Sequence, residues 1–167
     1  RRVAPAIPAY GAGVCPAGAT CPLPRRETDG EAALGSLIAD GAALYAACRR
    51  CAARSPHGAR RVLEQLAREQ QRTVRSLLAA YFLLTGRWRQ PPVPAVGLQE
   101  PWLTALRRVF LAESVLQRDC AALAEQLENG CLRQLLAAEA ERAAARGKSL
   151  AALLENSLTT ANNLLKW

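Results

Sequence analysis

The sequence predicts an all-α protein built as a four-helix bundle, in which one long crossover loop joins two helical hairpins. Half of the 167 residues are hydrophobic and only 5% are aromatic, with alanine and leucine dominant. This composition is typical of helices packed on helices. Four stretches also carry apolar residues at three- and four-residue steps, the spacing of one helix face. A short turn, a long connection and a second short turn separate these stretches.

An irregular tail is predicted before the first helix, over residues 1–28. It contains half of the ten prolines together with several glycines. Such a segment excludes a regular helix or a central strand. Cys15 and Cys21 lie in this tail, where they are either free thiols or the ends of a disulfide or metal clip.

The first helix is expected over about 30–54, because Thr28 or Asp29 can cap its start and Ser55-Pro56 stops it. Its inner stripe includes Gly41, and a glycine in mid-helix costs about 1 kcal/mol relative to alanine. We therefore expect either a bulky neighbour against Gly41 or the loss of a side chain that once projected there.

The second helix is expected over about 57–85, since it has no internal proline and ends at Gly86. Gln70 and Thr73 lie in the middle of its inner stripe, where apolar residues are expected. Polar side chains on a buried face cost free energy unless they are hydrogen-bonded. These two positions therefore indicate a polar feature at the centre of the bundle.

The crossover follows as a proline-rich, extended loop over about 87–100, long enough to run the length of a bundle. The third helix is expected over about 101–128, with proline at its first position. Glu113 places a carboxylate in the middle of its apolar stripe.

After the turn signal at residues 129–130, the fourth helix is expected over about 131–158, with small residues such as Ala140 and Ala143 at its centre. Residues 29–158 thus form the predicted bundle, and residues 159–167 form a C-terminal extension. The sequence of the first hairpin is weakly repeated in the second. An offset of 72 pairs Gly41 with Glu113, and an offset of 70 pairs Gln70 with Ala140.

This layout resembles the rubrerythrin branch of the ferritin-like superfamily, and most closely its small bacterial domains, whose second helix contains Glu-x-x-His followed by Leu, Tyr and Leu-Leu-Thr-Gly. The resemblance covers about residues 30–158. EQQRT at residues 69–73 takes the place of the motif, and Leu77, Tyr81 and LLTG at residues 83–86 follow in register. Such families bind two irons, using a Glu from helices one and three and a Glu-x-x-His from helices two and four.

Transferred residue by residue, the resemblance implies six ligand positions, and these hold Gly41, Gln70, Thr73, Glu113, Ala140 and Ala143. Only Glu113 among them is suited to iron, although a shift of one residue in the fourth helix brings Glu139 or Glu141 nearer. The single histidine, His57, lies in the turn at the bundle end. One carboxylate does not balance the charge of two irons.

The resemblance and this departure from it together predict a non-catalytic, metal-free bundle that acts as a structural or interaction protein. Two outcomes are open for Glu113. It is either buried, hydrogen-bonded to Gln70, Thr73 or Tyr45 and protonated, or it points past the helix edge to an arginine such as Arg72. The alternative function is a metal-binding or redox protein that retains Glu113 with nearby acids as its site.

A second alternative site consists of the thiols of Cys48, Cys51 and Cys120, which the helical stripes turn inward. Thiolates bind soft metals such as Cu(I) and Zn(II), and a pair of thiols can be redox-active. Buried cysteine also serves as a small hydrophobic residue that fills core space. The sequence favours this second interpretation, because no histidine is near.

Net charge is +8, and the whole excess lies between residues 46 and 90. This Arg-rich first hairpin is either a solvated surface or a face that binds an anionic partner. Its arginines are Arg49, Arg50, Arg54, Arg60, Arg61, Arg68, Arg72, Arg75, Arg87 and Arg89. The other partner that we expect is a second copy of the chain, bound through an exposed bundle face.

No run approaches the roughly 18 apolar residues of a membrane span. The first residues do not have the pattern of a signal peptide. The sequence therefore predicts no membrane span and a cytoplasmic location.

Overall fold

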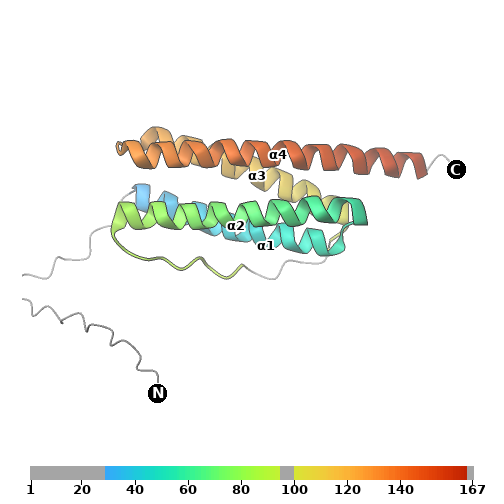
Figure 1. Ribbon diagram of the computed structural model, residues 1–167, viewed down its shortest axis with the longest axis horizontal. Helices are drawn as coiled ribbons and strands as arrows, with labels where there is room; N and C mark the ends of the chain where they lie inside the picture. The colour runs from blue at the N-terminus through green and yellow to red at the C-terminus, as the bar shows by residue number, and fades with distance from the viewer. Residues whose placement is uncertain (1–28, 95–99, 165–167) are drawn as a thin grey trace, which may run out of the picture.

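The computed structural model describes residues 29–94 and 100–164 (Figure 1), and these form four α-helices with their connections and contain no strand. The helices are α1 (Asp29–Arg54), α2 (His57–Thr85), α3 (Trp102–Gln126) and α4 (Gly130–Leu164). The predicted four-helix bundle is confirmed, with two hairpins joined by the crossover. The predicted tail over residues 1–28, with Cys15 and Cys21, lies outside the described residues.

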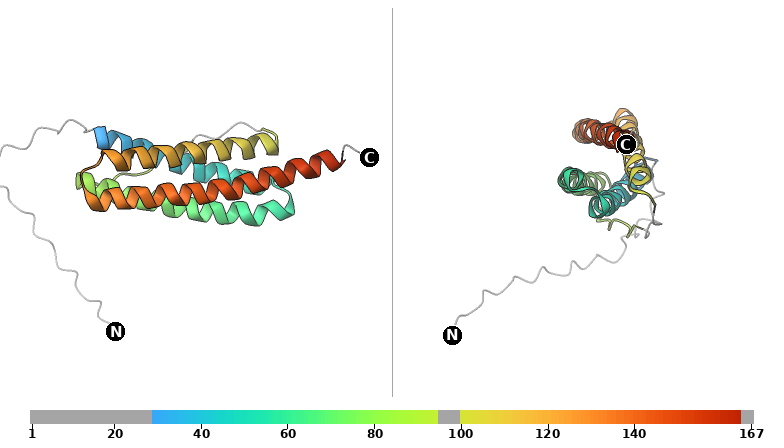
Figure 2. Two further views of the ribbon diagram at one scale, coloured as in Figure 1. Left: turned by 90° about the horizontal axis from the view of Figure 1, so that it is seen from above. Right: turned by 90° about the vertical axis from the view of Figure 1, so that its right-hand side faces the viewer.

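Each helix packs against two neighbours, which places the four helices at the corners of a bundle (Figure 2). The neighbouring pairs are α1 with α2, α3 with α4, α1 with α3, and α2 with α4. α1 and α4 run in one direction along the bundle and α2 and α3 in the other (Figure 1). A single cluster of buried residues, mainly leucine, alanine and cysteine, forms the core.

The helix ends follow local sequence signals. Gly86 ends α2 in the left-handed conformation, with φ 70°, and its N–H donates to the carbonyl of Phe82. Glycine adopts this conformation without the steric cost that other residues meet. The side-chain oxygen of Asn129 accepts hydrogen bonds from the backbone N–H groups of Cys131 and Leu132, at 3.0 and 3.2 Å. Asn129 therefore caps α4.

Two predicted boundaries differ from the structure. The third helix was expected to reach residue 128, but Leu127 is extended, with φ −84° and ψ 134°. This early exit leaves Asn129 free to cap the next helix. The fourth helix was expected to end at 158, but α4 continues to Leu164, because no glycine or proline follows Gly147 to stop it. Its last turns extend past the other helices (Figure 1).

The described start of the crossover, residues 87–94, lies along the α1–α2 hairpin (Figure 1). At its start the ring of Trp88 stacks on that of Phe82, with centroids 4.6 Å apart. Further on, residues 91–94 line an apolar groove together with side chains such as Ala42 and Val74. The described part of the loop thus has the extended course that its prolines predicted.

A buried carboxylate ties the start of the crossover to the end of the bundle. Glu31 in the first turn of α1 is 5% exposed. Its Oε1 accepts a hydrogen bond from the hydroxyl of Tyr81 at 2.8 Å and an ion-paired one from Arg87 at 2.5 Å. These contacts join α1, α2 and the first residue after the α2 cap.

We expect Tyr81→Phe to lower the free energy of unfolding by about 1.5–3 kcal/mol, since it removes one hydrogen bond to a buried charged group. Tyr45→Phe is the matched control, because its hydroxyl only accepts a 3.4 Å contact from exposed Arg49. That change should stay within about 0.5 kcal/mol. Urea denaturation of both variants measures the difference, and equal effects would contradict the role given to Glu31.

Candidate functional site

Five polar or charged side chains lie buried near the middle of the bundle. Gln70 and Thr73 on α2 and Glu113 on α3 are each at most 1% exposed, as their places in the apolar stripes predicted. α4 adds two more, Glu139 at 0% and Arg146 at 2%. The sequence left Glu139 open as a residue near the centre, but it gave no sign of Arg146.

The centre of this group is an ion pair between α3 and α4. The Nε of Arg146 donates to Oε1 of Glu113 at 2.8 Å, and NH2 lies 2.7 Å from the same oxygen. The third guanidinium nitrogen, NH1, donates to the hydroxyl of Thr73 on α2 at 3.1 Å. One arginine side chain therefore joins three of the four helices at the centre of the bundle.

Burial raises the pKa of Glu113 above its ordinary value, because it removes water from the charged form. The positive charge of Arg146 and its hydrogen bond act in the opposite direction. The pair exists in this setting because a buried charge is tolerated only beside an opposite charge with hydrogen bonds.

Glu113 is buried, which is the first of the two outcomes left open, but the partners predicted for it were wrong. Thr73 binds Arg146 instead of the carboxylate. Tyr45 accepts a contact from Arg49 on its own helix. The alternative partner, Arg72, is exposed, and Glu113 does not point past the helix edge to reach it.

The register predicted for the fourth helix explains why Arg146 was missed. Buried positions on α2 and α4 correspond at an offset of 73, which pairs Leu63 with Leu136 and Thr73 with Arg146. The offset of 70 in the sequence analysis assigned Thr73 to Ala143 and Gln70 to Ala140 instead. Ala140 and Ala143 are buried, but under the new register the positions equivalent to Gln70 and Thr73 are Ala143 and Arg146.

The first and third helices keep the predicted offset of 72, which pairs Gly41 with Glu113, since every buried position of α3 matches a buried position of α1. A Cβ added at Gly41 would lie 3.2 Å from a Val74 methyl group and 3.5 Å from the Gln70 amide nitrogen. The absent side chain of Gly41 therefore makes room for α2. The Gln70 amide donates a long, 3.5 Å hydrogen bond to the Gly41 carbonyl, and its own oxygen has no partner among the described residues.

Glu139 is a second buried carboxylate near the middle of the bundle, whereas Glu141 is exposed. Oε1 of Glu139 is ion-paired with Arg142, one turn further along α4. Its Oε2 is buried and has no hydrogen-bond partner among the described residues. The alternative metal site, Glu113 with nearby acids, would have to use carboxylates that arginines already hold.

Three of the four described cysteines are buried in the core, namely Cys48, Cys51 and Cys120. Burial raises the pKa of Cys48 and Cys120 to about 12 and that of Cys51 to about 11. Without a bound metal, these thiols are therefore protonated at neutral pH. Over residues 29–94 and 100–164, no group of three or more His, Cys, Asp or Glu residues is placed to hold a metal ion.

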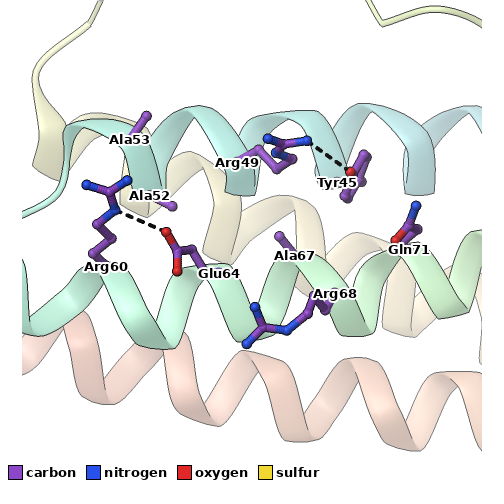
Figure 3. Close-up of a pocket in the computed structure, with 9 residues that line it drawn as sticks. All are labelled: Tyr45, Arg49, Ala52, Ala53, Arg60, Glu64, Ala67, Arg68 and Gln71. Carbon is purple, nitrogen blue, oxygen red and sulfur yellow. Dashed lines mark hydrogen bonds and ion pairs between the residues drawn. The ribbon is translucent and has the colours of Figure 1, made fainter.

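The Arg-rich first hairpin carries a pocket of about 330 Å³ between α1 and α2 (Figure 3). Arg49, Arg60 and Arg68 line it, but their guanidinium groups lie apart from one another (Figure 3). Each contacts a side chain on its own helix. Arg60 pairs with Glu64 at 3.0 Å, and Arg68 donates to Gln65 at 2.9 Å. This pocket therefore does not offer three converging donors to an anion.

No family model matches this chain, and no curated protein matches it. The fold has a solved counterpart. A crystal structure of a conserved hypothetical protein from Mycobacterium tuberculosis is similar, with a TM-score of 0.64. The two sequences are 18% identical, and the match covers 77% of this chain and 100% of the other. At this identity the likeness shows the four-helix fold and does not assign a function.

None of the helices in the described ranges is both long and apolar enough to cross a membrane.

We expect Glu113→Leu to lower the free energy of unfolding by about 3–5 kcal/mol, because it leaves Arg146 as a buried cation without a partner. Arg146→Met should also destabilise. The double variant should recover most of the loss, since similar apolar side chains often replace a buried pair without cost. Chemical denaturation of the four proteins gives the coupling between the two sites.

The single variant Arg146→Met also has an expected pH dependence. Without the arginine, the pKa of Glu113 in the folded state is raised further above its unfolded value. The folded state then binds more protons between the two pKa values, so stability falls as pH rises through that interval. The coupling experiment has its own contradicting outcome. If the double variant loses as much free energy of unfolding as Glu113→Leu and Arg146→Met lose together, the two residues are not paired.

Proposed function

We propose that this protein is a metal-free bundle of the ferritin-like type, in which an arginine–glutamate pair replaces a di-iron centre. It acts as a non-catalytic structural or interaction protein. The observation that carries the proposal is the buried guanidinium of Arg146, held between Glu113 and Thr73.

The position of Arg146 supports this interpretation. Gln70-x-x-Thr73 occupies the place of the Glu-x-x-His motif on the second helix. Under the offset of 73, the equivalent segment of the fourth helix is Ala143-x-x-Arg146. Arg146 thus takes the place of the second histidine of the ferritin-like pattern. An arginine cannot serve as a metal ligand in its place, because the guanidinium remains protonated and has no acceptor atom.

The donor chemistry of the centre does not fit two irons. Glu113 is the single carboxylate at the positions equivalent to iron ligands, and it already accepts two contacts from the guanidinium of Arg146. Gln70 and Thr73 contribute an amide and a hydroxyl, and Ala143 contributes no donor atom. A guanidinium would repel the metal ions, and the remaining ligands would not balance their charge. The residues present therefore support a centre stabilised by the ion pair.

Elemental analysis of protein purified without chelators tests this proposal. We expect well under one equivalent of iron, copper or zinc per chain, and no change in thermal midpoint on adding EDTA or ferrous iron. Binding of a metal to the folded state would raise the midpoint. About two irons per chain, the ferritin-like complement, would overturn the proposal, and stoichiometric copper or zinc would favour the thiols of Cys48, Cys51 and Cys120.

The α1–α3 face supports the interaction part of the proposal. Leu111 and Val115 on α3 are 59% and 41% exposed. Val115 lines a groove of about 450 Å³ with small residues such as Ala43, and Leu111 lies one turn before Val115 on α3, outside the groove. The charged side chains of Asp40, Arg50 and Arg108 also line this groove. Exposed apolar residues grouped on one face favour association with another protein surface, and we propose that a second copy of the chain binds here.

Light scattering coupled to size-exclusion chromatography should therefore give the mass of a dimer for the wild-type protein. Leu111→Glu should shift it toward a monomer, because it places a charge in the apolar contact. Leu83→Glu is the control, since Leu83 is similarly exposed, at 64%, but lies on α2. A monomeric wild-type protein, or dissociation by both variants alike, would contradict this interface.

A further inference from the structure

The junction between α2 and α4 contains a polar pocket of about 470 Å³, called here the seam pocket. These two helices pack less closely than the other neighbouring pairs. The side chains that matter are Glu69, Arg72 and Ser76 from α2, and Glu139, Arg142 and Arg146 from α4. Positive and negative groups thus line the same opening.

The seam pocket contains an acceptor without a donor. Glu139, which lines it, is 0% exposed. One carboxylate oxygen is ion-paired with Arg142, and the other, Oε2, has no hydrogen-bond partner among the described residues. A buried charged oxygen in this state costs free energy that a donated hydrogen bond would recover. A ligand that satisfies Glu139 must therefore supply an N–H or O–H group.

The same pocket offers several donors. Arg72 is exposed, and the side chain of Arg142 is 61% exposed. The NH2 group of Arg146 lies near Glu113, but it makes no hydrogen bond of good geometry. Guanidinium groups bind oxyanions strongly, through paired and charge-assisted hydrogen bonds. Glu113 already balances the charge of Arg146, so Arg72 and Arg142 are the arginines of this pocket that can bind an anion.

We propose that the seam pocket binds a protonated oxyanion, with inorganic phosphate as the ligand. Its O–H group donates to Oε2 of Glu139, and its remaining oxygens accept from Arg72 and Arg142. An unprotonated oxyanion of similar size, such as sulfate, meets the Glu139 carboxylate without a hydrogen to donate. The pocket therefore selects phosphate by its proton. This site does not depend on whether the bundle centre is free of metal.

Isothermal titration at about pH 8 with phosphate, sulfate and phenyl phosphate tests the proposal. The second pKa of a phosphate ester is about 6, so phenyl phosphate carries no proton at that pH. We expect one phosphate per chain, with sulfate and phenyl phosphate weaker by roughly tenfold or more, because each lacks the hydrogen bond to a charged acceptor. Equal binding of all three anions, or no binding of phosphate, would overturn the proposal.

Glu139→Gln should narrow the difference between phosphate and sulfate, because an amide can donate to either anion. Glu141→Gln, an exposed change on the same helix, should leave the difference intact. Arg72→Ala should weaken phosphate binding by roughly tenfold, the effect of losing a charge-assisted hydrogen bond. Arg75→Ala, one turn along and beside the crossover groove, should leave binding unchanged.

Circular dichroism establishes that each variant is folded before it is titrated. If Glu139→Gln does not fold, the Arg72 and Arg75 pair still decides where the anion binds. An unchanged preference for phosphate in folded Glu139→Gln, or equal weakening by the two arginine variants, would refute the seam pocket as the site.

Discussion

The buried contact between Arg146 and Glu113 is the constraint on which the centre of this bundle depends. Each charge alone would be costly in the core, and each is present because the other is within 2.8 Å. Because Arg146 also donates to Thr73, the alignment of α4 is fixed against both α2 and α3. A core of leucines alone tolerates helices that slide past each other by a turn. The contacts of one guanidinium group with one carboxylate form at only one alignment of the helices.

The sequence predicted the architecture well because its signals are local and periodic. Apolar spacing located the helices, and Gly86 and Asn129 mark ends that the structure confirms through a left-handed glycine and a side-chain cap. The place of Glu113 in an apolar stripe made its burial one of two predicted outcomes, and the structure shows that outcome. The predictions about metal, partner and location remain predictions, since nothing in the fold tests them.

The identity of the buried partner could not be predicted in the same way. Apolar spacing treats arginine as a surface residue, and it therefore predicted only small residues such as Ala140 and Ala143 at the centre of the fourth helix. A signal for the correct alignment was present in the leucines. An offset of 73 pairs Leu63 with Leu136 and Leu77 with Leu150, and all four are 0% exposed. Matching large apolar residues would have placed Arg146 opposite Thr73.

The buried thiols described above have a consequence for oxidative chemistry. Peroxide reacts with the thiolate, and a pKa of about 12 leaves Cys48 and Cys120 almost wholly protonated at neutral pH. Cys131, exposed beside the α4 cap, lacks this protection by burial. Among the described cysteines, oxidants would therefore modify the one at the rim of the bundle while the sulfur-containing interior stays reduced, and that position is one that the packing of the four helices does not need.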